Sequence, residues 1–262
     1  MPHTPTLVSI MINAARKAAR PMARDFGEVE ALQVSRKGAA DFVSRADLAA
    51  EQTIFEALSA ARPKYGFVME ERGEIEGADN SNRWIVDPLD GTTNFLHGLP
   101  HFAISIALER DRQPYAGVVY NPVTDELFWA EKGEGAYLND RRIRVSSRRD
   151  LSECLFACGL PFAGRPGRAD ALAETDRVLE KTAGVRRFGA AALDLAFVAA
   201  GRYDAYWERG LNSWDVAAGA IIVREAGGMV SEIEGGPKFL TAGSILAANS
   251  ELYDQARRLV LG

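Results

Sequence analysis

The 262-residue sequence lacks several features that mark secreted, membrane-spanning or nucleic-acid-binding proteins. It has only two cysteines, Cys154 and Cys158, which are too few for a disulfide framework and match no zinc-binding spacing. No apolar run approaches the roughly 18 residues of a membrane span, and the N-terminal stretch has no signal-peptide order of basic, apolar and small residues. The net charge of −5 disfavours nucleic acid, because a phosphate backbone attracts basic surfaces. These absences predict a soluble cytoplasmic protein that does not engage membranes.

The sequence does contain a regular succession of apolar segments with helical or extended periodicity. Helices are expected where apolar residues recur every three or four positions, and strands where β-branched and aromatic residues cluster between Gly, Pro and Asn. The expected helices cover residues 7–24, 48–61 (capped by Ser44 or Asp47), 170–182, 190–200 and 215–226, with a last helix capped by Ser250. The expected strands cover residues 32–35, 66–71, 83–87, 102–110, 114–122, 126–139, 203–208 and 245–249.

The order of these elements indicates one mixed domain. The strands between residues 102 and 139 follow one another with only short turns, which is typical of an antiparallel meander, whereas elsewhere strands alternate with helices. The fold class is therefore α/β or α+β. No Pro- or Ser-rich linker divides the chain, so a single domain over residues 1–262 is expected, with an N-terminal lobe over about 1–140 and a C-terminal lobe over about 141–262.

The stretch WIVDPLDGTTNFLHG, residues 84–98, places two aspartates directly after a buried strand. Carboxylates at the end of a buried strand lose hydration unless they are paired or bind a cation. Mg²⁺ prefers such hard oxygen ligands and is usually completed by water and substrate phosphate. Pro88 is expected to fix a turn, so that Asp87, Asp90 and the Leu89 carbonyl face one point. This stretch predicts a magnesium site.

The residues that follow predict an anion site beside the cations. Gly91-Thr92-Thr93 lies at an expected helix start, where free backbone N–H groups favour an anion and glycine lets a phosphate approach the backbone. A cation site next to an anion site is the arrangement that phosphoryl transfer uses.

A purely structural interpretation exists for each of these acids taken alone. Asp90 and Asp215 could each be a helix N-cap, and Glu70 a solvated strand end. A cap, however, needs neither the preceding Asp-Pro nor a second acid. The combination of Asp87 and Asp90 with Glu70 upstream and Asp215 downstream therefore favours a metal site.

Two motifs in this order carry a resemblance to a known family. Residues 87–95 read DPLDGTTNF, residues 214–219 read WDVAAG, and the glutamate pair of the MEE segment stands upstream of both. The sequence resembles the inositol monophosphatases, within the Mg²⁺-dependent, lithium-sensitive phosphatases, and is most similar to the bacterial extragenic-suppressor type. The resemblance extends from the first expected helix to the last. It implies a layered αβαβα sandwich, a homodimer and hydrolysis of a small-molecule phosphate monoester.

The resemblance also implies which residues hold two or three Mg²⁺ ions. Glu70, Asp87 and the Leu89 carbonyl hold the first ion in such enzymes, while Asp87, Asp90 and Asp215 share the second. A third, weaker ion lies near Glu70.

Further roles are implied for catalysis and substrate binding. Thr92, oriented by Asp47, helps to deprotonate the attacking water, and Glu70 also counts among the catalytic residues. The implied substrate-binding residues are Asp90, Gly91, Thr92, Ala191, Glu208 and Asp215. The family often has Ser or Thr where this sequence has Ala190, so one hydroxyl contact to the substrate is absent here.

Other substrates and one other class of function stay open at this point. The same fold serves histidinol phosphate, nucleotide 3′-phosphates and sugar phosphates, and Glu208 favours a small polyol, myo-inositol 1-phosphate. The RRIRVSSRR segment (141–149) could bind RNA or the transcription machinery, although Ile143 and Val145 alternate with arginine as in a half-buried strand. The two cysteines are expected in the core, and the GLPFAGRPG stretch (159–167) is a loop whose relation to the site the sequence leaves open.

Overall fold

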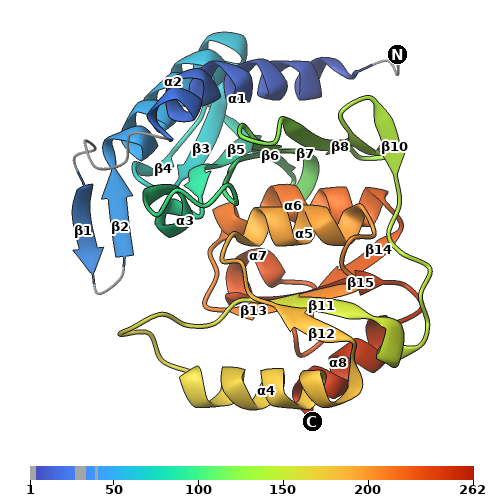
Figure 1. Ribbon diagram of the computed structural model, residues 1–262. Coiled ribbons are helices and arrows are strands. Elements are labelled where there is room, and N and C mark those ends of the chain that lie inside the picture. Colours follow the sequence, from blue (N-terminus) through green and yellow to red (C-terminus); the bar gives the residue numbers. More distant parts are fainter. Residues whose placement is uncertain (1–3, 27–33, 39–40) are drawn as a thin grey trace.

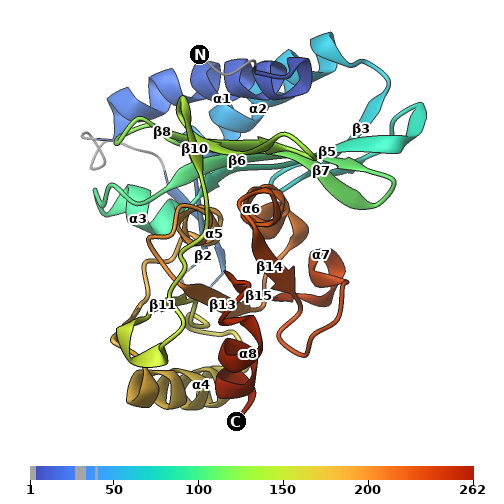
Figure 2. The same ribbon diagram turned by 90° about the vertical axis from the view of Figure 1, so that its right-hand side faces the viewer.

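Two large β-sheets and three helical layers alternate through the molecule (Figures 1 and 2). The computed structural model describes residues 4–26, 34–38 and 41–262, and for residues 34–38 and 41–44 it describes the backbone alone. The layers follow the order helices α1 and α2, an eight-stranded sheet, helices α5 and α6, a five-stranded sheet, and helices α4 and α8. The predicted αβαβα sandwich is therefore confirmed.

The larger sheet comes from the first half of the chain. Its strand order is β10-β9-β8-β7-β6-β5-β3-β4, antiparallel except for the parallel pair β3 and β5. The strands are β3 (Tyr65–Met69), β4 (Gly73–Ile75), β5 (Asp79–Asp90), β6 (Ala103–Arg110), β7 (Gln113–Asn121), β8 (Glu126–Glu131), β9 (Gly135–Leu138) and β10 (Arg141–Ile143). The predicted meander is the consecutive run from β6 to β10.

Both faces of this sheet are buried, and alternate residues of each strand enter different cores. In β5, Trp84 and Val86 pack towards helices α1 (Thr6–Asp25) and α2 (Arg45–Ala61), while Ile85 packs towards α5 (Ala191–Ala199) and α6 (Ser213–Glu225). A strand covered on both sides has apolar side chains at every position, which is why the sequence WIV shows no polar alternation.

The smaller sheet comes from the second half of the chain. Its order is β12-β11-β13-β15-β14, and its outer face is covered by α4 (Arg168–Lys181) and α8 (Tyr253–Leu261) (Figure 1). The strands are β11 (Leu155–Cys158), β12 (Gly184–Arg186), β13 (Ala205–Arg209), β14 (Gly228–Ser231) and β15 (Ser244–Asn249). Cys154 and Cys158 are both buried and unbridged under α4 and α8, as predicted.

Helices α5 and α6 pack against both large sheets, and small residues allow the close packing that this position requires. A Cβ atom on Gly219 of α6 would lie 2.5 Å from Cβ of Leu195 of α5. A Cβ on Gly117 of β7 would lie 2.7 Å from the Ala218 carbonyl oxygen of α6. The remaining elements are short: β1 (Val34–Gly38), β2 (Asp41–Ser44), α3 (Thr92–Leu96), the 3₁₀ turn η2 (Leu151–Glu153) and α7 (Phe239–Ala242).

A few predicted boundaries differ from the structure. The predicted strand at 32–35 lies partly outside the described residues, and β1 begins at Val34. The predicted cap at Ser250 is wrong, because α8 begins at Tyr253 with Leu252 at its N-cap position. Asp47 lies inside the first turn of α2, and so is not its cap. No helix among the described residues is long and apolar enough to cross a membrane.

Candidate functional site

The two aspartates of the DPLD motif reach the same face of the sheet through a β-bulge. On β5, Asp87 pairs with Ser105 of β6 and Asp90 pairs with Ala103, so three residue steps oppose two. Residues three apart in a regular strand point to opposite faces, and one extra residue restores the same face. The predicted turn at Pro88 is therefore wrong. The chain remains in β5 up to Asp90 and directs both carboxylates towards the α5 and α6 layer.

Two further carboxylates join them from other elements. Glu70 directly follows β3, and its N–H donates to the Val86 carbonyl at 3.2 Å, which places it alongside Asp87. Asp215 lies in the first turn of α6, where it accepts the Asn212 N–H at 2.6 Å. The four acids predicted as metal ligands thus meet at the ends of β3, β5 and α6.

Burial and mutual repulsion disfavour the charged forms of these acids. Burial, followed by the charges of Glu70, Asp90 and Asp215, raises the pKa of Asp87 well above its usual range. Burial and the Asp215 charge do the same to the pKa of Asp90, although the Ala192 N–H donates to its carboxylate at 2.7 Å. Burial also raises the pKa of Asp215 to about 7. Among the described residues, neither Asp87 nor Asp90 has a Lys or Arg partner.

The donor chemistry of this cluster fits a hard divalent cation. All its side-chain donors are carboxylate oxygens, the ligands that Mg²⁺ prefers. In the described part of the chain, no three Asp, Glu, His or Cys side chains are gathered into a ready-made metal cage. Mg²⁺ usually keeps several waters and binds through one or two carboxylates plus substrate phosphate, which is compatible with this looser arrangement.

Thr92 lies directly beside the carboxylates, held by a residue from a distant helix. Its hydroxyl is 3.1 Å from the Asp47 carboxylate and 3.1 Å from the Leu89 carbonyl oxygen. Asp47 is buried in α2, so its carboxylate is fixed in place. The structure therefore brings together the threonine and aspartate that the family resemblance pairs.

Gly91 connects β5 to α3 at a crowded point that only glycine fits. Its φ is +92°, a left-handed conformation that costs other residues free energy. A Cβ here would also lie 3.0 Å from the His101 carbonyl oxygen and 3.2 Å from Cβ of Ala190. The Gly91 backbone thus lies between the loop before β6 and the segment that leads into α5.

The remaining predicted substrate contacts come from α5 and β13. Ala191 is the first residue of α5, and Glu208 projects from β13. The Glu208 carboxyl lies against Gly159, where any Cβ would clash with it, and it accepts a hydrogen bond from the Tyr206 hydroxyl. Burial raises the pKa of Glu208.

One cavity of about 320 Å³ contains most of these groups. Glu70, Asp90, Gly91, Thr92, Ala191, Glu208 and Asp215 all line it. The 159–167 loop borders it through Leu160, Pro161, Phe162 and Arg165. Arg165 and Arg187 also line it and were not predicted, because single arginines outside a motif give no signal in one sequence.

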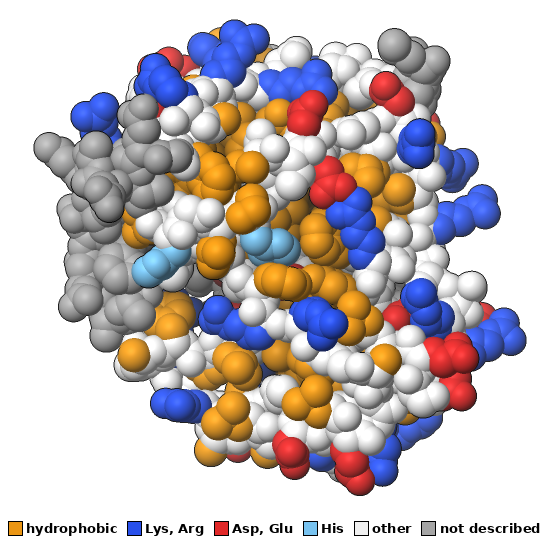
Figure 3. All heavy atoms as spheres, viewed as in Figure 1, with side chains coloured by type: hydrophobic (Ala, Val, Ile, Leu, Met, Phe, Trp, Pro, Cys, Tyr) orange, Lys and Arg blue, Asp and Glu red, His pale blue; other side chains and the backbone are white. Residues whose placement is uncertain are grey.

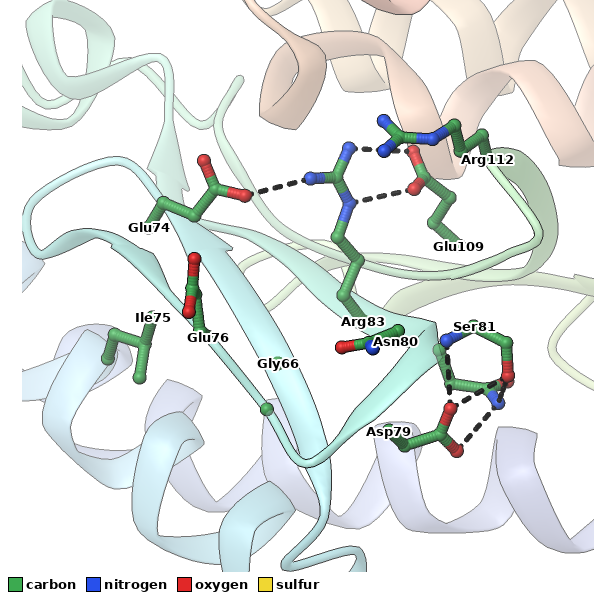
Figure 4. A pocket seen from close by; sticks show the side chains of 12 residues that line it. Gly66, Glu74, Ile75, Glu76, Asp79, Asn80, Ser81, Arg83, Glu109 and Arg112 are labelled. Carbon is green, nitrogen blue, oxygen red and sulfur yellow. Dashed lines mark hydrogen bonds and ion pairs between the residues drawn. The ribbon is translucent and has the colours of Figure 1, made fainter.

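A second cavity of about 280 Å³ lies near the start of β5, away from the acid cluster (Figure 4). Arg83 crosses it and pairs with Glu109 at 2.7 Å and Glu74 at 3.0 Å. Asp79 accepts hydrogen bonds from Ser81 and Asn82. Because these polar groups satisfy one another, this cavity is not the candidate site.

Comparison with known proteins places the site in a family. The sequence profile of the inositol monophosphatase family matches residues 5–260, which is nearly the entire chain. The chain belongs to the inositol monophosphatase family. As a member of this family it is a metal-dependent phosphatase. The family resemblance that its sequence motifs indicated is confirmed.

Individual members of the inositol monophosphatase family are similar over nearly their whole length. A protein of Caulobacter vibrioides named inositol-1-monophosphatase is 60% identical, over 94% of this chain and 97% of its own. The Escherichia coli K12 protein named Nus factor SuhB is 44% identical, over 93% of this chain and 91% of its own. The crystal structure of extragenic suppressor protein suhB from Bartonella henselae has a TM-score of 0.95 at 54% identity and covers 98% of both chains.

Proposed function

We propose that this chain hydrolyses myo-inositol 1-phosphate, or a closely related inositol monophosphate, with Mg²⁺ as its cofactor. The observation that carries the proposal is the meeting of Glu70, Asp90 and Asp215 with Gly91 and Thr92 in one cavity, with the buried Asp87 beside Asp90 on β5. Relatives named inositol-1-monophosphatase at 54–60% identity support the substrate.

The proposed metal site uses the donors already described. Glu70, Asp87, Asp90 and Asp215 would hold two or three Mg²⁺ ions together with the Leu89 carbonyl. When bound, Mg²⁺ supplies positive charge that offsets the charge of the phosphate group and acidifies nearby water.

The chain's own groups orient the reactants and accept a proton. The Thr92 hydroxyl, hydrogen-bonded to Asp47, orients the attacking water, and the Asp47–Thr92 pair receives its proton. The Gly91 and Thr92 amides bind the phosphate oxygens. Asp90, the Ala191 backbone and Glu208 bind polyol hydroxyls and fix the orientation of the ring.

A substrate panel tests this proposal. Purified protein should hydrolyse inositol 1-phosphate with Mg²⁺, and kcat/KM should be higher than for histidinol phosphate, a nucleotide 3′-phosphate and fructose 1,6-bisphosphate. Chelation of Mg²⁺ should abolish turnover, and Li⁺ should inhibit it. A higher kcat/KM for another member of the panel would replace the inositol assignment with that substrate.

A second candidate function is binding of the transcription machinery, which the name of the Escherichia coli relative suggests. The arginine segment gives it little support. Arg148 pairs with Asp204 at 3.2 Å and Arg149 with Glu251 at 3.3 Å, so both serve the fold. On the face shown in Figure 3, Lys and Arg side chains are scattered among Asp and Glu and form no continuous basic surface.

We further propose a cytoplasmic homodimer. The dimer follows from the family resemblance and is tested by sedimentation velocity, in which a single species of twice the chain mass is expected.

A further inference from the structure

Asp194 is a buried carboxylate that the proposed reaction does not use. It lies in the first turn of α5 with no exposed surface, and neither of its carboxylate oxygens has a hydrogen-bond partner in the protein. A buried polar group without a hydrogen-bond partner lowers the stability of the fold, so such groups are rare.

The nearest basic group is the imidazole of His101. Its Nε2 lies 3.8 Å from Asp194 Oδ1 and likewise has no hydrogen-bond partner. The ring is held between two aromatic side chains, with centroids 4.8 Å from Phe188 and 5.7 Å from Phe197. The separation is about 1 Å longer than a direct hydrogen bond. A small rotation of either side chain completes the link.

The two residues come from segments that contribute different parts of the site. His101 belongs to the loop between α3 and β6, which follows Gly91 and Thr92. Asp194 is one turn from the start of α5, where the Ala192 N–H donates to Asp90. The buried Asn94 amide joins the same segments, because it donates to the His101 carbonyl at 2.7 Å and to the Phe188 carbonyl at 2.8 Å.

The surroundings favour a neutral pair that shares one proton. Burial, with the charges of Glu208 and Asp90, raises the pKa of Asp194 well above its usual range, and Arg187 opposes this shift. Burial lowers the pKa of His101 to about 4. The other titratable groups influenced by Asp194 are Tyr203, Tyr206 and Cys158, and burial raises the pKa of each, so all three are neutral at pH 7.

We propose that Asp194 and His101 form a positioning pair, in which a shared proton ties the start of α5 to the loop that follows Gly91 and Thr92. The link holds the Ala192 N–H against Asp90 and the Ala191 backbone at the substrate wall. Neither residue touches the substrate or metal. The inference rests on the proposed function, since it concerns the same site.

A double-mutant cycle tests the pair. Asp194→Leu removes the carboxyl but keeps the branched shape and the number of non-hydrogen atoms, and His101→Phe removes Nε2 but keeps the aromatic stacking. Each variant should lower kcat for inositol 1-phosphate about tenfold, because small misplacements of site groups are costly. The double variant should lose no more than either single variant, since both break one link. Asp194→Asn, a neutral hydrogen-bonding side chain, should restore most of the rate.

Two other measurements separate positioning from a structural role. The melting temperature of the double variant should be unchanged or higher while its kcat stays low, because apolar replacement of both partners of a buried polar pair is often neutral or stabilising, whereas each single variant leaves one buried partner unpaired. The Mg²⁺ dissociation constant, measured by calorimetry without substrate, should rise about tenfold, as it does when support for a ligand is lost. His97→Phe, at an exposed histidine of the same loop, is the matched control and should change nothing.

Several outcomes overturn the inference. Additive losses of kcat would show that the residues act separately. Unchanged kcat and Mg²⁺ affinity in His101→Phe would exclude positioning even if Asp194→Leu failed to fold, and losses that only parallel a fall in melting temperature would reduce the pair to a structural role. If the wild-type protein did not hydrolyse inositol 1-phosphate, the proposed function would fail, while Mg²⁺ affinity would still decide the inference.

Discussion

Asp90 is the residue on which most of the proposed site converges. It lies at the end of β5 beyond the bulge, accepts the Ala192 N–H from α5, and is close enough to Asp215 for their charges to interact. It therefore links the larger sheet and the central helices beside the proposed cation site. A change of this single carboxylate should separate metal binding from folding.

Asp90→Asn should abolish turnover and leave the fold intact. The amide keeps the shape and can still accept the Ala192 N–H, but it loses the charge that holds Mg²⁺, so kcat/KM should fall more than about 100-fold. The melting temperature without Mg²⁺ should rise, because repulsion between buried carboxylates decreases. Turnover assays and thermal melts check both results, with the exposed Asp170→Asn on α4 as control. Near-normal turnover would refute the ligand role.

The raised pKa of Asp215 predicts how stability depends on pH. The pKa is about 7 in the folded protein and close to 4 in an unfolded chain. Between these values the folded state binds a proton that the unfolded state does not, so the free energy of unfolding should decrease as pH rises from about 4 to 7. Mg²⁺ binds the ionised form and should offset this loss.

Thermal melts at several pH values with and without Mg²⁺ measure this effect. The increase in melting temperature caused by Mg²⁺ should be larger at pH 8 than at pH 6, and Asp215→Asn should remove most of the difference. An increase of the same size at every pH would contradict the assignment of Asp215 as a ligand that titrates near neutrality.

At the scale of helices and strands, sequence patterns predicted the positions of the elements better than they predicted the local backbone geometry within them. The apolar runs placed β5, β6, α5 and α6 because hydrophobic periodicity reflects burial directly. The sequence predicted a turn between Asp87 and Asp90, where the structure has a β-bulge. Asp-Pro is compatible with a turn and with a bulge, and only the pairing register with β6 distinguishes the two.

Contacts between distant elements could not be predicted from the sequence either, because they too depend on how the elements pack. Spacing alone does not show that Asp47 reaches Thr92 across 45 positions, and only the family resemblance joined them. The contact between His101 and Asp194 had no such signal, because a lone histidine and a lone aspartate in apolar segments match no motif.

The packing of α5 against α6 should be sensitive to one added methyl group. Gly219→Ala would gain about 1 kcal/mol from helix propensity. Its Cβ, however, would lie 2.5 Å from Cβ of Leu195, an atom fixed to the backbone of α5. Overpacking of this kind costs about 1–3 kcal/mol, so the free energy of unfolding should decrease. Denaturant titration checks this, and a more stable variant would show that the helices can move apart.

At the scale of the molecule, the central helices make one structural unit of the two halves. Helices α5 and α6 pack on both sheets, and the proposed metal ligands come from the larger sheet and from the first turn of α6. We propose on this basis that the lobes at about 1–140 and 141–262 fold as one domain.

The exposed arginines of the connecting segment should be dispensable for catalysis. Arg141, Arg142 and Arg144 are exposed at and after the edge strand β10. Ile143 and Val145 pack on the core as predicted, but the strand ends at Ile143. Replacing the three arginines with alanine should leave kcat/KM within about twofold, the usual range for surface changes.

Steady-state kinetics and sedimentation of this triple variant check the expectation. Arg148→Ala is the contrasting variant and should lower the melting temperature, because it leaves the buried Asp204 without its cation. A collapse of turnover in the triple variant would assign the segment to the active site or to a subunit interface.

The central layer also has a consequence for biosynthesis. Every strand of the eight-stranded sheet precedes α5 and α6 in the chain, and these are the helices that cover the second face of that sheet. As the chain leaves the ribosome, the sheet can therefore be complete while this apolar face is still bare. Exposed hydrophobic faces of this kind bind chaperones and aggregate. A nascent chain arrested after β10 should thus be captured by chaperones, and one extended beyond α6 should be released.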